Sequence, residues 1–229
     1  MDIALPDFEV FERIGVGCMG EVYRARQIQL DREVALKILL PQFANDPGFC
    51  ERFFREVRAA AKLYHPNIVQ ILSVDNQQGQ LYLFIEYVDG GDLSHRLQST
   101  HSQKPLSIDE IVTILTALTN ALDFAHSLGY VHGDIKPANI LFRKSGSLVI
   151  SDFGLAKAIY SDAAPSISGS MVGTPLYTSP EQAQALTLDG HSDLYSVGVI
   201  AFQMLTGELP YKGNSALNIA IKHISHPVP

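Results

Sequence analysis

The sequence predicts an α+β protein in two parts, a strand-rich part over residues 1–88 and a mainly helical part over residues 89–229. Three observations support this prediction. Short apolar segments with strand-like alternation recur before residue 88, and one helical pattern interrupts them. The sequence Asp89-Gly90-Gly91-Asp92 then marks a change of composition. The two most apolar helical patterns both follow it, so we expect the second part to be built mainly from helices.

Composition narrows the possible functions. The chain has 229 residues, of which 46% are hydrophobic and 18% charged, as in ordinary globular proteins. Its net charge of −7 argues against a role in nucleic-acid binding. Its two cysteines, Cys18 and Cys50, provide neither a disulfide framework nor paired zinc-ligand spacing, which favours a reducing compartment such as the cytoplasm. The sequence shows neither signal-peptide features nor an apolar run of about 18 residues, so we expect no membrane contact from this segment.

Five segments of the first part have strand character and one has helical character. The strands are expected at residues 8–14, 22–26, 33–40, 69–74 and 81–88, and the helix at residues 49–64. A G-x-G-x-x-G-x-V sequence from Gly15 to Val22 joins the first two strands. Glycines permit positive φ and let backbone N–H groups approach a phosphate closely. Because a strand follows the loop directly, the pattern differs from a dinucleotide-binding turn, which opens a helix.

Lys37 and Glu56 are candidate partners in the first part. Lys37 lies in the third strand, in the sequence Val34-Ala35-Leu36-Lys37, and Glu56 lies on the helix. A single strand lysine is more often a solvated residue, so a functional interpretation of Lys37 requires a partner. Glu51 is the competing carboxylate, but it lies more than a turn before Glu56, nearer the start of the helix, where a solvated acid is the simpler interpretation.

Three helices are predicted in the second part. Ser107 and Glu110 form a capping box that opens the first helix, and Gly129 closes it. The second is expected to run from Asp193 to Gly207 as a wholly buried apolar helix, and the third to cover residues 217–224.

Two apolar runs between the first and second of these helices, at residues 140–142 and 148–150, predict a short hairpin. The hairpin would bring Asp152 next to Asn139. Carboxylate and amide oxygens of this kind suit Mg²⁺, which prefers one or two carboxylates together with phosphate oxygens. Asp134, five residues before Asn139, would then be free to meet a substrate hydroxyl.

These residues belong to two motifs, Tyr130-Val131-His132-Gly133-Asp134-Ile135-Lys136-Pro137-Ala138-Asn139 and Ser151-Asp152-Phe153-Gly154. Together with the glycine loop they resemble the catalytic core of the eukaryotic-like, Hanks-type protein kinases, and in particular the bacterial serine/threonine kinases. The resemblance covers about residues 8–224. It implies a bilobal fold, with a five-stranded antiparallel first lobe that carries one helix and a mainly helical second lobe. It also implies transfer of the γ-phosphoryl group of ATP, with Mg²⁺, to serine or threonine hydroxyls of proteins.

The resemblance implies a role for each matching catalytic residue. Asp134 would be the catalytic base, and Lys136 would stabilise charge on the γ-phosphoryl group. Asn139 and Asp152 would hold Mg²⁺ ions that bridge the phosphates. Thr174 would bridge Asp134 and Lys136.

The resemblance also implies a nucleotide site. Lys37, paired with Glu56, would hold the α- and β-phosphates. Backbone groups of Glu86 and Val88 would meet the adenine, and Asp92 would reach the ribose. The remaining implied contacts come from residues that would line the phosphate and adenine positions, namely Ile14, Gly15, Gly17, Gly20, Val22, Ala35, Ile85, Leu141 and Asp152.

Gly133 departs from the family, because most protein kinases have an arginine there that binds a phosphate on the activation segment. We therefore predict that activity does not depend on a phosphate docking at residue 133. The His-Gly-Asp sequence also resembles small-molecule kinases of the aminoglycoside phosphotransferase type, and a non-catalytic nucleotide-binding scaffold is a further alternative. Against the small-molecule alternative, Gly173-Thr174-Pro175 and Pro180-Glu181 resemble the end of a protein-kinase activation segment.

Four further expectations concern residues outside these motifs. Ser179 stands where the family usually has alanine, a change expected to be of little consequence. Glu181 is expected to lack the late arginine that pairs with it in the family, because Lys212 and Lys222 are the only basic residues after it apart from histidines. The second lobe would accordingly be truncated, as in a fragment of a longer parent with further domains. His126 is expected to cap or pack its helix.

Overall fold

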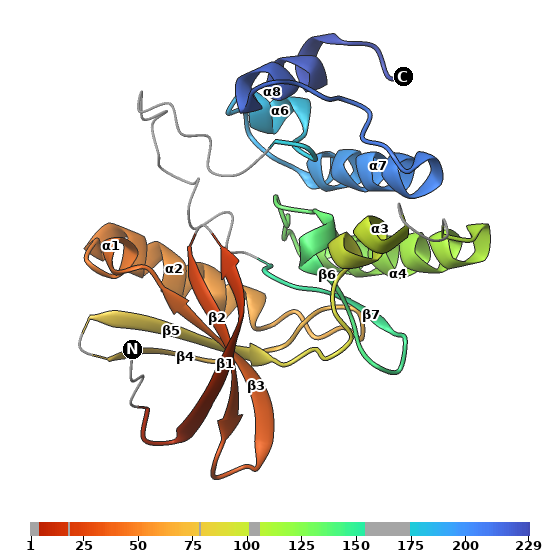
Figure 1. Ribbon diagram of the computed structural model, residues 1–229. Coiled ribbons are helices and arrows are strands. Elements are labelled where there is room, and N and C mark those ends of the chain that lie inside the picture. Colours follow the sequence, from red (N-terminus) through yellow and green to blue (C-terminus); the bar gives the residue numbers. More distant parts are fainter. Residues whose placement is uncertain (1–4, 18, 78, 101–105, 154–174) are drawn as a thin grey trace. The chain divides into compact units, whose positions relative to one another are not determined.

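The structure is a computed structural model that describes residues 5–17, 19–77, 79–100, 106–153 and 175–229 (Figure 1). The chain forms two compact units, one of Met1–Tyr64 with Val69–Val88 and one of His65–Ile68 with Asp89–Pro229. The first unit contains β1 (Phe8–Gly17), β2 (Gly20–Gln27), β3 (Arg32–Leu39), α1 (Pro41–Ala44), α2 (Pro47–Ala60), β4 (Ile71–Gln77) and β5 (Gln80–Glu86). The second contains α3 (Leu93–Thr100), α4 (Ile108–Ser127), η1 (Pro137–Asn139), β6 (Ile140–Phe142), β7 (Leu148–Ile150), α6 (Pro180–Ala183), α7 (Gly190–Thr206) and α8 (Ala216–Ser225).

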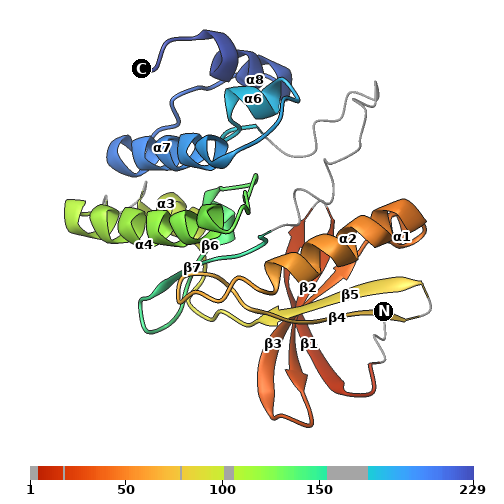
Figure 2. The same cartoon turned by 180° about the vertical axis from the view of Figure 1, so that it is seen from behind.

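The first unit is an antiparallel five-stranded sheet in the order β1-β2-β3-β5-β4, with α2 packed against β4 (Figure 2). The predicted α+β class and five-stranded sheet are confirmed. The prediction of a single helix was incomplete, because the four-residue α1 precedes α2. The helix also begins earlier and ends earlier than predicted. The Asp46 carboxylate caps it by accepting from the Phe49 N–H at 3.1 Å, and Pro47 at the first helical position needs no hydrogen bond.

One face of this sheet carries a buried apolar cluster. The buried residues on it are joined by Phe8, whose ring stacks on that of Phe84 at 4.1 Å between centroids. Burial of these side chains fixes the strand register, because a shift by one residue would turn every one of them to the other face. The buried members are Leu5, Ala25, Val34, Leu36 and Phe84.

The opposite face of the sheet carries several predicted site residues. Directly paired residues of antiparallel strands share a face, as do alternate residues along one strand. The pairs Gly15↔Val22, Val22↔Lys37 and Ala35↔Ile85 therefore place these five residues on one face, which we name the Lys37 face.

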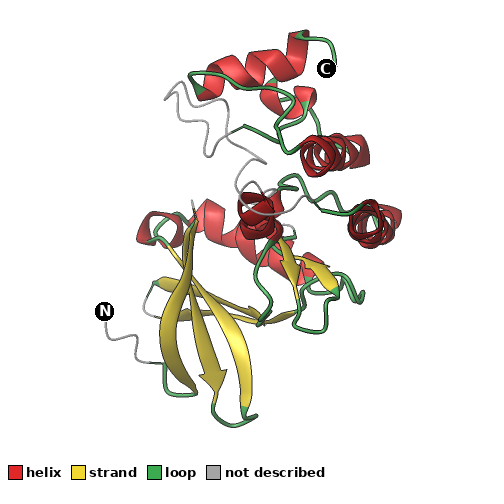
Figure 3. Ribbon diagram, turned by 45° about the vertical axis from the view of Figure 1, so that its right-hand side comes forward, coloured by secondary structure: helices red, strands yellow, loops and turns green. Residues whose placement is uncertain are grey.

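The second unit is mainly helical, and among its described residues the strands are the short hairpin pair β6 and β7 (Figure 3). The predicted capping box is present at α4, where the Ser107 hydroxyl accepts from the Glu110 N–H and the Glu110 carboxylate accepts from the Ser107 N–H. The predicted hairpin is also present, with Ile140 paired to Ile150. Within the described ranges, no helix is long and apolar enough to cross a membrane.

Helix α7 differs from its prediction at its start and in its burial. It begins at Gly190, because the Asp189 carboxylate caps it by accepting from the His191 N–H at 2.9 Å. Asp193 therefore lies in the first turn and does not open the helix. The helix ends as predicted at Gly207, which adopts φ 75°. It is not wholly buried, since Leu194 and Leu205 are 49% and 59% exposed.

Candidate active site

The centre of the site is the carboxylate of Asp134 in the second unit. Its Oδ2 atom accepts from the Lys136 ammonium at 2.7 Å and from the Asn139 side-chain amide at 3.1 Å. The same amide donates to the Asp134 backbone carbonyl at 2.8 Å. Among the described residues Oδ1 has no hydrogen-bond partner, so one oxygen of the carboxylate is held in place and the other can accept a proton from a substrate.

His132 joins the segment before Asp134 to the turn that carries Asp152. The ring is fully buried, its Nδ1 accepts from the Asp134 N–H at 3.1 Å, and its Nε2 lies 2.8 Å from the Ser151 carbonyl. These partners require the tautomer with a proton on Nε2. The edge-on contact between the His132 and Phe153 rings, at 4.5 Å between centroids, supports the same connection.

Asp193 of α7 fixes the backbone on the other side of His132. Its carboxylate, only 1% exposed, accepts from the N–H of His132 at 2.9 Å and from the N–H of Gly133 at 2.8 Å. His126 lies 2.7 Å from the same carboxylate through Nε2. His126 is therefore more than the capping or packing residue expected from the sequence. Gly190 allows this contact, because a Cβ atom there would lie 2.7 Å from the His126 ring.

Asn139 and Asp152 are brought together as predicted. The Ser151 N–H donates to the Asn139 carbonyl at 2.9 Å, which extends the β6–β7 pairing by one step towards Asp152. Since both hydrogens of an amide are on nitrogen, the contacts of Asn139 with Asp134 leave its side-chain oxygen for a cation. Asp152 has φ 65°, a left-handed conformation that non-glycine residues adopt mainly where function or packing requires it. One amide oxygen and one carboxylate fit a Mg²⁺ ion that takes its other ligands from phosphates and water.

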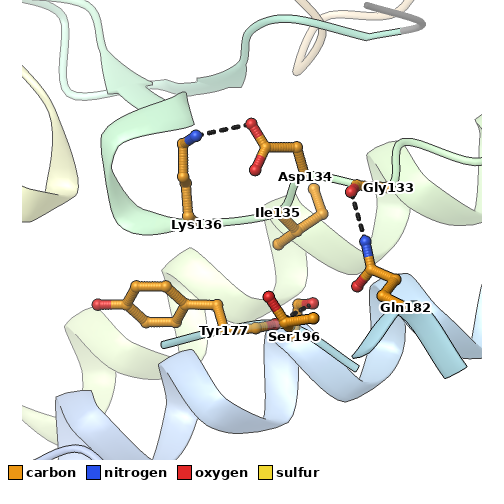
Figure 4. Close-up of a pocket in the computed structure, with 8 residues that line it drawn as sticks. Gly133, Asp134, Ile135, Lys136, Tyr177, Gln182 and Ser196 are labelled. Atoms are coloured by element: carbon orange, nitrogen blue, oxygen red, sulfur yellow. Dashed lines mark hydrogen bonds and ion pairs between the residues drawn. The ribbon is translucent and has the colours of Figure 1, made fainter. Parts of the chain in front are cut away.

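A small cavity of about 40 Å³ lies beside Asp134 in the second unit (Figure 4). Tyr177 lines it and is fixed by two contacts with α7: its hydroxyl donates to Gln203 at 2.7 Å, and its carbonyl accepts from Ser196 at 2.7 Å. Burial raises the pKa of the Tyr177 hydroxyl to about 12, although the Gln203 contact acts in the opposite direction, so Tyr177 stays neutral near pH 7. The cavity is lined by Gly133, Asp134, Ile135, Lys136, Tyr177, Thr178, Gln182 and Ser196.

One sequence expectation for the neighbouring helix α6 was wrong. Ser179 is not a neutral replacement, because its fully buried side chain caps α6 by accepting from the Gln182 N–H at 3.3 Å. Glu181 lacks the late arginine, as expected from the sequence, but the Ser192 hydroxyl donates to its carboxylate in place of that partner. Sequence reasoning also missed Gln182, whose amide donates to the Gly133 carbonyl at 2.6 Å. The pattern Ser-x-x-Gln from residue 179 to 182 is a capping box and could have revealed both Ser179 and Gln182.

In the first unit, Lys37 and Glu56 are both buried, each 7% exposed. Lys37 lies on the Lys37 face, and Glu56 lies on α2, where Arg55 approaches its carboxylate to 3.1 Å. Buried charges need compensating partners, so the burial of Lys37 excludes the solvated edge residue considered from the sequence alone.

The three glycines of the glycine loop differ in how much room their surroundings leave for a side chain. A Cβ atom at Gly20 would lie 1.9 Å from the backbone oxygen of Ile38, so the sheet itself requires glycine there. At Gly15 and Gly17 an added Cβ would meet nothing closer than 3.8 Å and 4.0 Å. Packing within the described residues thus explains why residue 20 is glycine, but not why residues 15 and 17 are. Glycine at Gly15 and Gly17 fits a ligand that approaches the backbone there.

The remaining predicted nucleotide contacts are distributed over both units. The Glu86 N–H already donates to the Gln70 carbonyl at 2.9 Å, so the predicted adenine contact through the backbone of Glu86 would have to use its carbonyl. The Asp92 carboxylate caps α3 by accepting from the His95 N–H at 2.8 Å. Ile14 is 44% exposed, whereas Val88 and Leu141 are half-buried. Gly154 and Thr174, with the segment between them, lie outside the described residues.

Comparison with known proteins decides the family, because residues 8–227 match the protein kinase domain. The chain belongs to the protein kinase family. This kinase domain is 41% identical to the probable serine/threonine-protein kinase PknB of Lactococcus lactis, over 97% of this chain and 35% of that protein. It is 39% identical to the serine/threonine-protein kinase PrkC of Bacillus subtilis, over 97% of this chain and 34% of that protein. The chain thus spans about a third of the length of the curated relatives it matches.

A solved structure supports the same assignment. The Mycobacterium tuberculosis PknI kinase domain is similar to this kinase domain with a TM-score of 0.73 and 30% identity, covering 91% of this chain and 78% of that one. The predicted resemblance to Hanks-type bacterial serine/threonine kinases is confirmed by these matches. They favour a protein kinase over a small-molecule phosphotransferase. Membership of the family implies use of ATP and a divalent metal.

Proposed function

We propose that this chain is the catalytic domain of a serine/threonine protein kinase, with Asp134 as the catalytic base. The supporting observation is the arrangement around Asp134, where Lys136 and Asn139 fix Oδ2 and leave Oδ1 for a substrate hydroxyl. The relatives named as serine/threonine kinases support the choice of acceptor.

Proton and phosphoryl transfer would then proceed through residues of the second unit. The hydroxyl oxygen of a substrate serine or threonine forms a bond to the γ-phosphorus of ATP, while the bond from that phosphorus to the β–γ bridging oxygen breaks. The electron pair stays with ADP, and the hydroxyl proton passes to Oδ1 of Asp134. The Lys136 ammonium, 2.7 Å from Oδ2, also offsets negative charge on the transferred group.

Asn139 and Asp152 would hold Mg²⁺, which supplies positive charge to neutralise the phosphates. Lys37 would contact the α- and β-phosphates and pair with Glu56, whose burial favours a partner of opposite charge. The Lys37 face, with Gly17, would provide the remaining contacts to the nucleotide.

We assign different roles to the two parts of the chain. Residues 1–88 would bind the nucleotide. Residues 89–229 would carry the catalytic residues and bind the protein substrate, with Thr174 bridging Asp134 and Lys136. The length of the relatives supports a longer parent with further domains. Dependence on ATP supports action in the cytoplasm. Because Gly133 has no side chain, a phosphate on the activation segment would not be needed at that position.

The test is phosphoryl transfer from Mg-ATP to a generic protein acceptor by the full-length protein. In Asp134→Asn, turnover should fall by about 10²- to 10⁴-fold, as expected for loss of a general base, with ATP affinity retained. In Asp152→Asn, Mg²⁺-dependent ATP binding should weaken. Glu110→Gln, in the capping box of α4, is the control and should leave both unchanged. Tight ATP binding without transfer by the wild type would instead indicate a non-catalytic scaffold.

A further inference from the structure

The peptide group between Gly133 and Asp134 is fixed on both of its polar atoms. Its carbonyl oxygen accepts from the Gln182 Nε2 at 2.6 Å, and its N–H donates to the His132 Nδ1 at 3.1 Å. Figure 4 shows the Gln182 amide nitrogen aimed at the Gly133 oxygen from the side of α6. This peptide group directly precedes the Cα atom that carries the Asp134 carboxylate, so its orientation decides where that carboxylate points.

The peptide group after Gly133 needs these two hydrogen bonds because glycine is conformationally free. It adopts φ 72°, a conformation that glycine reaches without strain, but glycine also reaches many others. Residue 133 has no side chain that could limit this freedom through a contact of its own. The hydrogen bonds of its N–H to Asp193 and of its carbonyl to Gln182 are what select one conformation.

The orientation of the Gln182 amide is fixed by Ser179. The Ser179 N–H donates to the Gln182 Oε1 at 2.9 Å, which identifies this atom as the oxygen. The other amide atom must therefore be the nitrogen, and it faces Gly133. The Gln182 side chain thus completes the capping box of α6 and at the same time supports the peptide before Asp134.

We propose that Gln182 is a positioning residue for phosphoryl transfer, which holds the Gly133 carbonyl so that the Asp134 carboxylate faces the substrate hydroxyl. The inference rests on the proposed kinase function. Tyr177 and Thr178, which line the cavity beside Asp134, lie just before the helix that carries Gln182. The segment from Tyr177 to Gln182 therefore aligns the catalytic base through the Gln182 side chain, without a phosphate contact at residue 133.

Two substitutions separate positioning from capping. Gln182→Glu keeps an acceptor for the Ser179 N–H, as Glu110 does for Ser107 in α4, but places a carboxylate oxygen against the Gly133 carbonyl. Gln182→Met removes both the acceptor and the donor. A capping role alone predicts that the methionine variant is the worse of the two. A positioning role predicts that the glutamate variant is the worse in turnover, because it adds repulsion at Gly133.

The measurement is kcat and KM for ATP of the full-length protein, together with its thermal midpoint. We expect kcat to decrease from wild type to Gln182→Met to Gln182→Glu, with a loss of about 10- to 100-fold in the last, since small misplacements of a reacting group have effects of this size. KM for ATP should stay the same. Between the two variants the thermal midpoint should follow the opposite order, with Gln182→Glu at least as stable as Gln182→Met and neither more stable than the wild type.

The reverse exchange Glu110→Gln is the matched control, because it changes the same capping-box position in α4, where the side chain accepts from the Ser107 N–H, and should leave kcat unchanged. Wild-type kcat in Gln182→Glu, or a larger loss in Gln182→Met than in Gln182→Glu, would overturn the inference while leaving the kinase function intact. Absence of phosphoryl transfer in the wild type would instead contradict the proposed function itself.

Discussion

The two candidate functional loops of this chain, the glycine loop in the first unit and the segment around Asp134 in the second, are stabilised by different means. The glycine loop lies at the ends of β1 and β2, and backbone pairing sets its geometry as far as Gly17 and Gly20. The Asp134 segment is shaped by side chains from distant positions, chiefly Asp193 and Gln182. Substitutions should therefore act through the backbone in one loop and through lost side-chain contacts in the other.

The largest effect should come from Asp193. In Asp193→Ala, two backbone N–H groups and His126 lose a buried carboxylate, and we expect the free energy of unfolding to fall by about 3 kcal/mol or more. Turnover should fall as well, because the backbone before Asp134 is released. Denaturant unfolding and kcat of the same preparation measure both. If stability and kcat stayed near wild type, the Asp134 segment would not depend on side chains from α7.

An intermediate effect is expected in the glycine loop, where Gly20 and Gly17 should behave differently. In Gly20→Ala the new methyl group would collide with the Ile38 carbonyl, so the free energy of unfolding should fall by about 1–3 kcal/mol. Gly17→Ala has room, and its stability should change by less than about 0.5 kcal/mol, while KM for ATP rises. Equal losses of stability in the two variants would show that a Cβ atom is no less tolerated at residue 20 than at residue 17.

The smallest effect concerns pH and comes from histidines of the second unit, because the first, over residues 1–64 and 69–88, contains none. Burial lowers the pKa of the His223 imidazole, against the opposing effect of the Leu176 and Pro175 carbonyls. Around its ordinary pKa the unfolded chain therefore binds more protons than the folded one. The free energy of unfolding should then decrease as pH falls below about 6.5 towards the lowered pKa.

His223→Phe should remove part of this dependence, measured as the slope of unfolding free energy against pH between neutral pH and pH 5. Phenylalanine retains a ring between Tyr195 and Tyr211, which both contact His223 edge-on. It also removes the 2.8 Å contact of the His223 Nδ1 with the Tyr195 hydroxyl, so the slope against pH, and not the stability at one pH, reports the charge. His65, whose pKa is also lowered by burial, should account for part of the remaining slope. An unchanged slope in the variant would exclude His223 as a source of it.

Much of the fold and the site could be predicted from local sequence. The five-stranded sheet followed from alternating apolar residues, and the capping box at Ser107 from a four-residue pattern. The hairpin that brings Asn139 and Asp152 together followed from two apolar runs. Predictions failed where an end of a helix depended on one capping residue, as with Asp46 at α2 and Asp189 at α7.

The sequence by itself determined the family and the strand pattern and supplied the candidate residues of the proposed reacting centre, because each of these depends on a short motif with fixed spacing. Only the tertiary structure decided how Asp134 is oriented. His126, Asp193 and Gln182 lie 8 residues before, 59 after and 48 after it, by difference of their positions in the sequence. Their contacts depend on how α4, α6 and α7 pack, since side-chain hydrogen bonds form only when folding brings the two partners within about 3 Å.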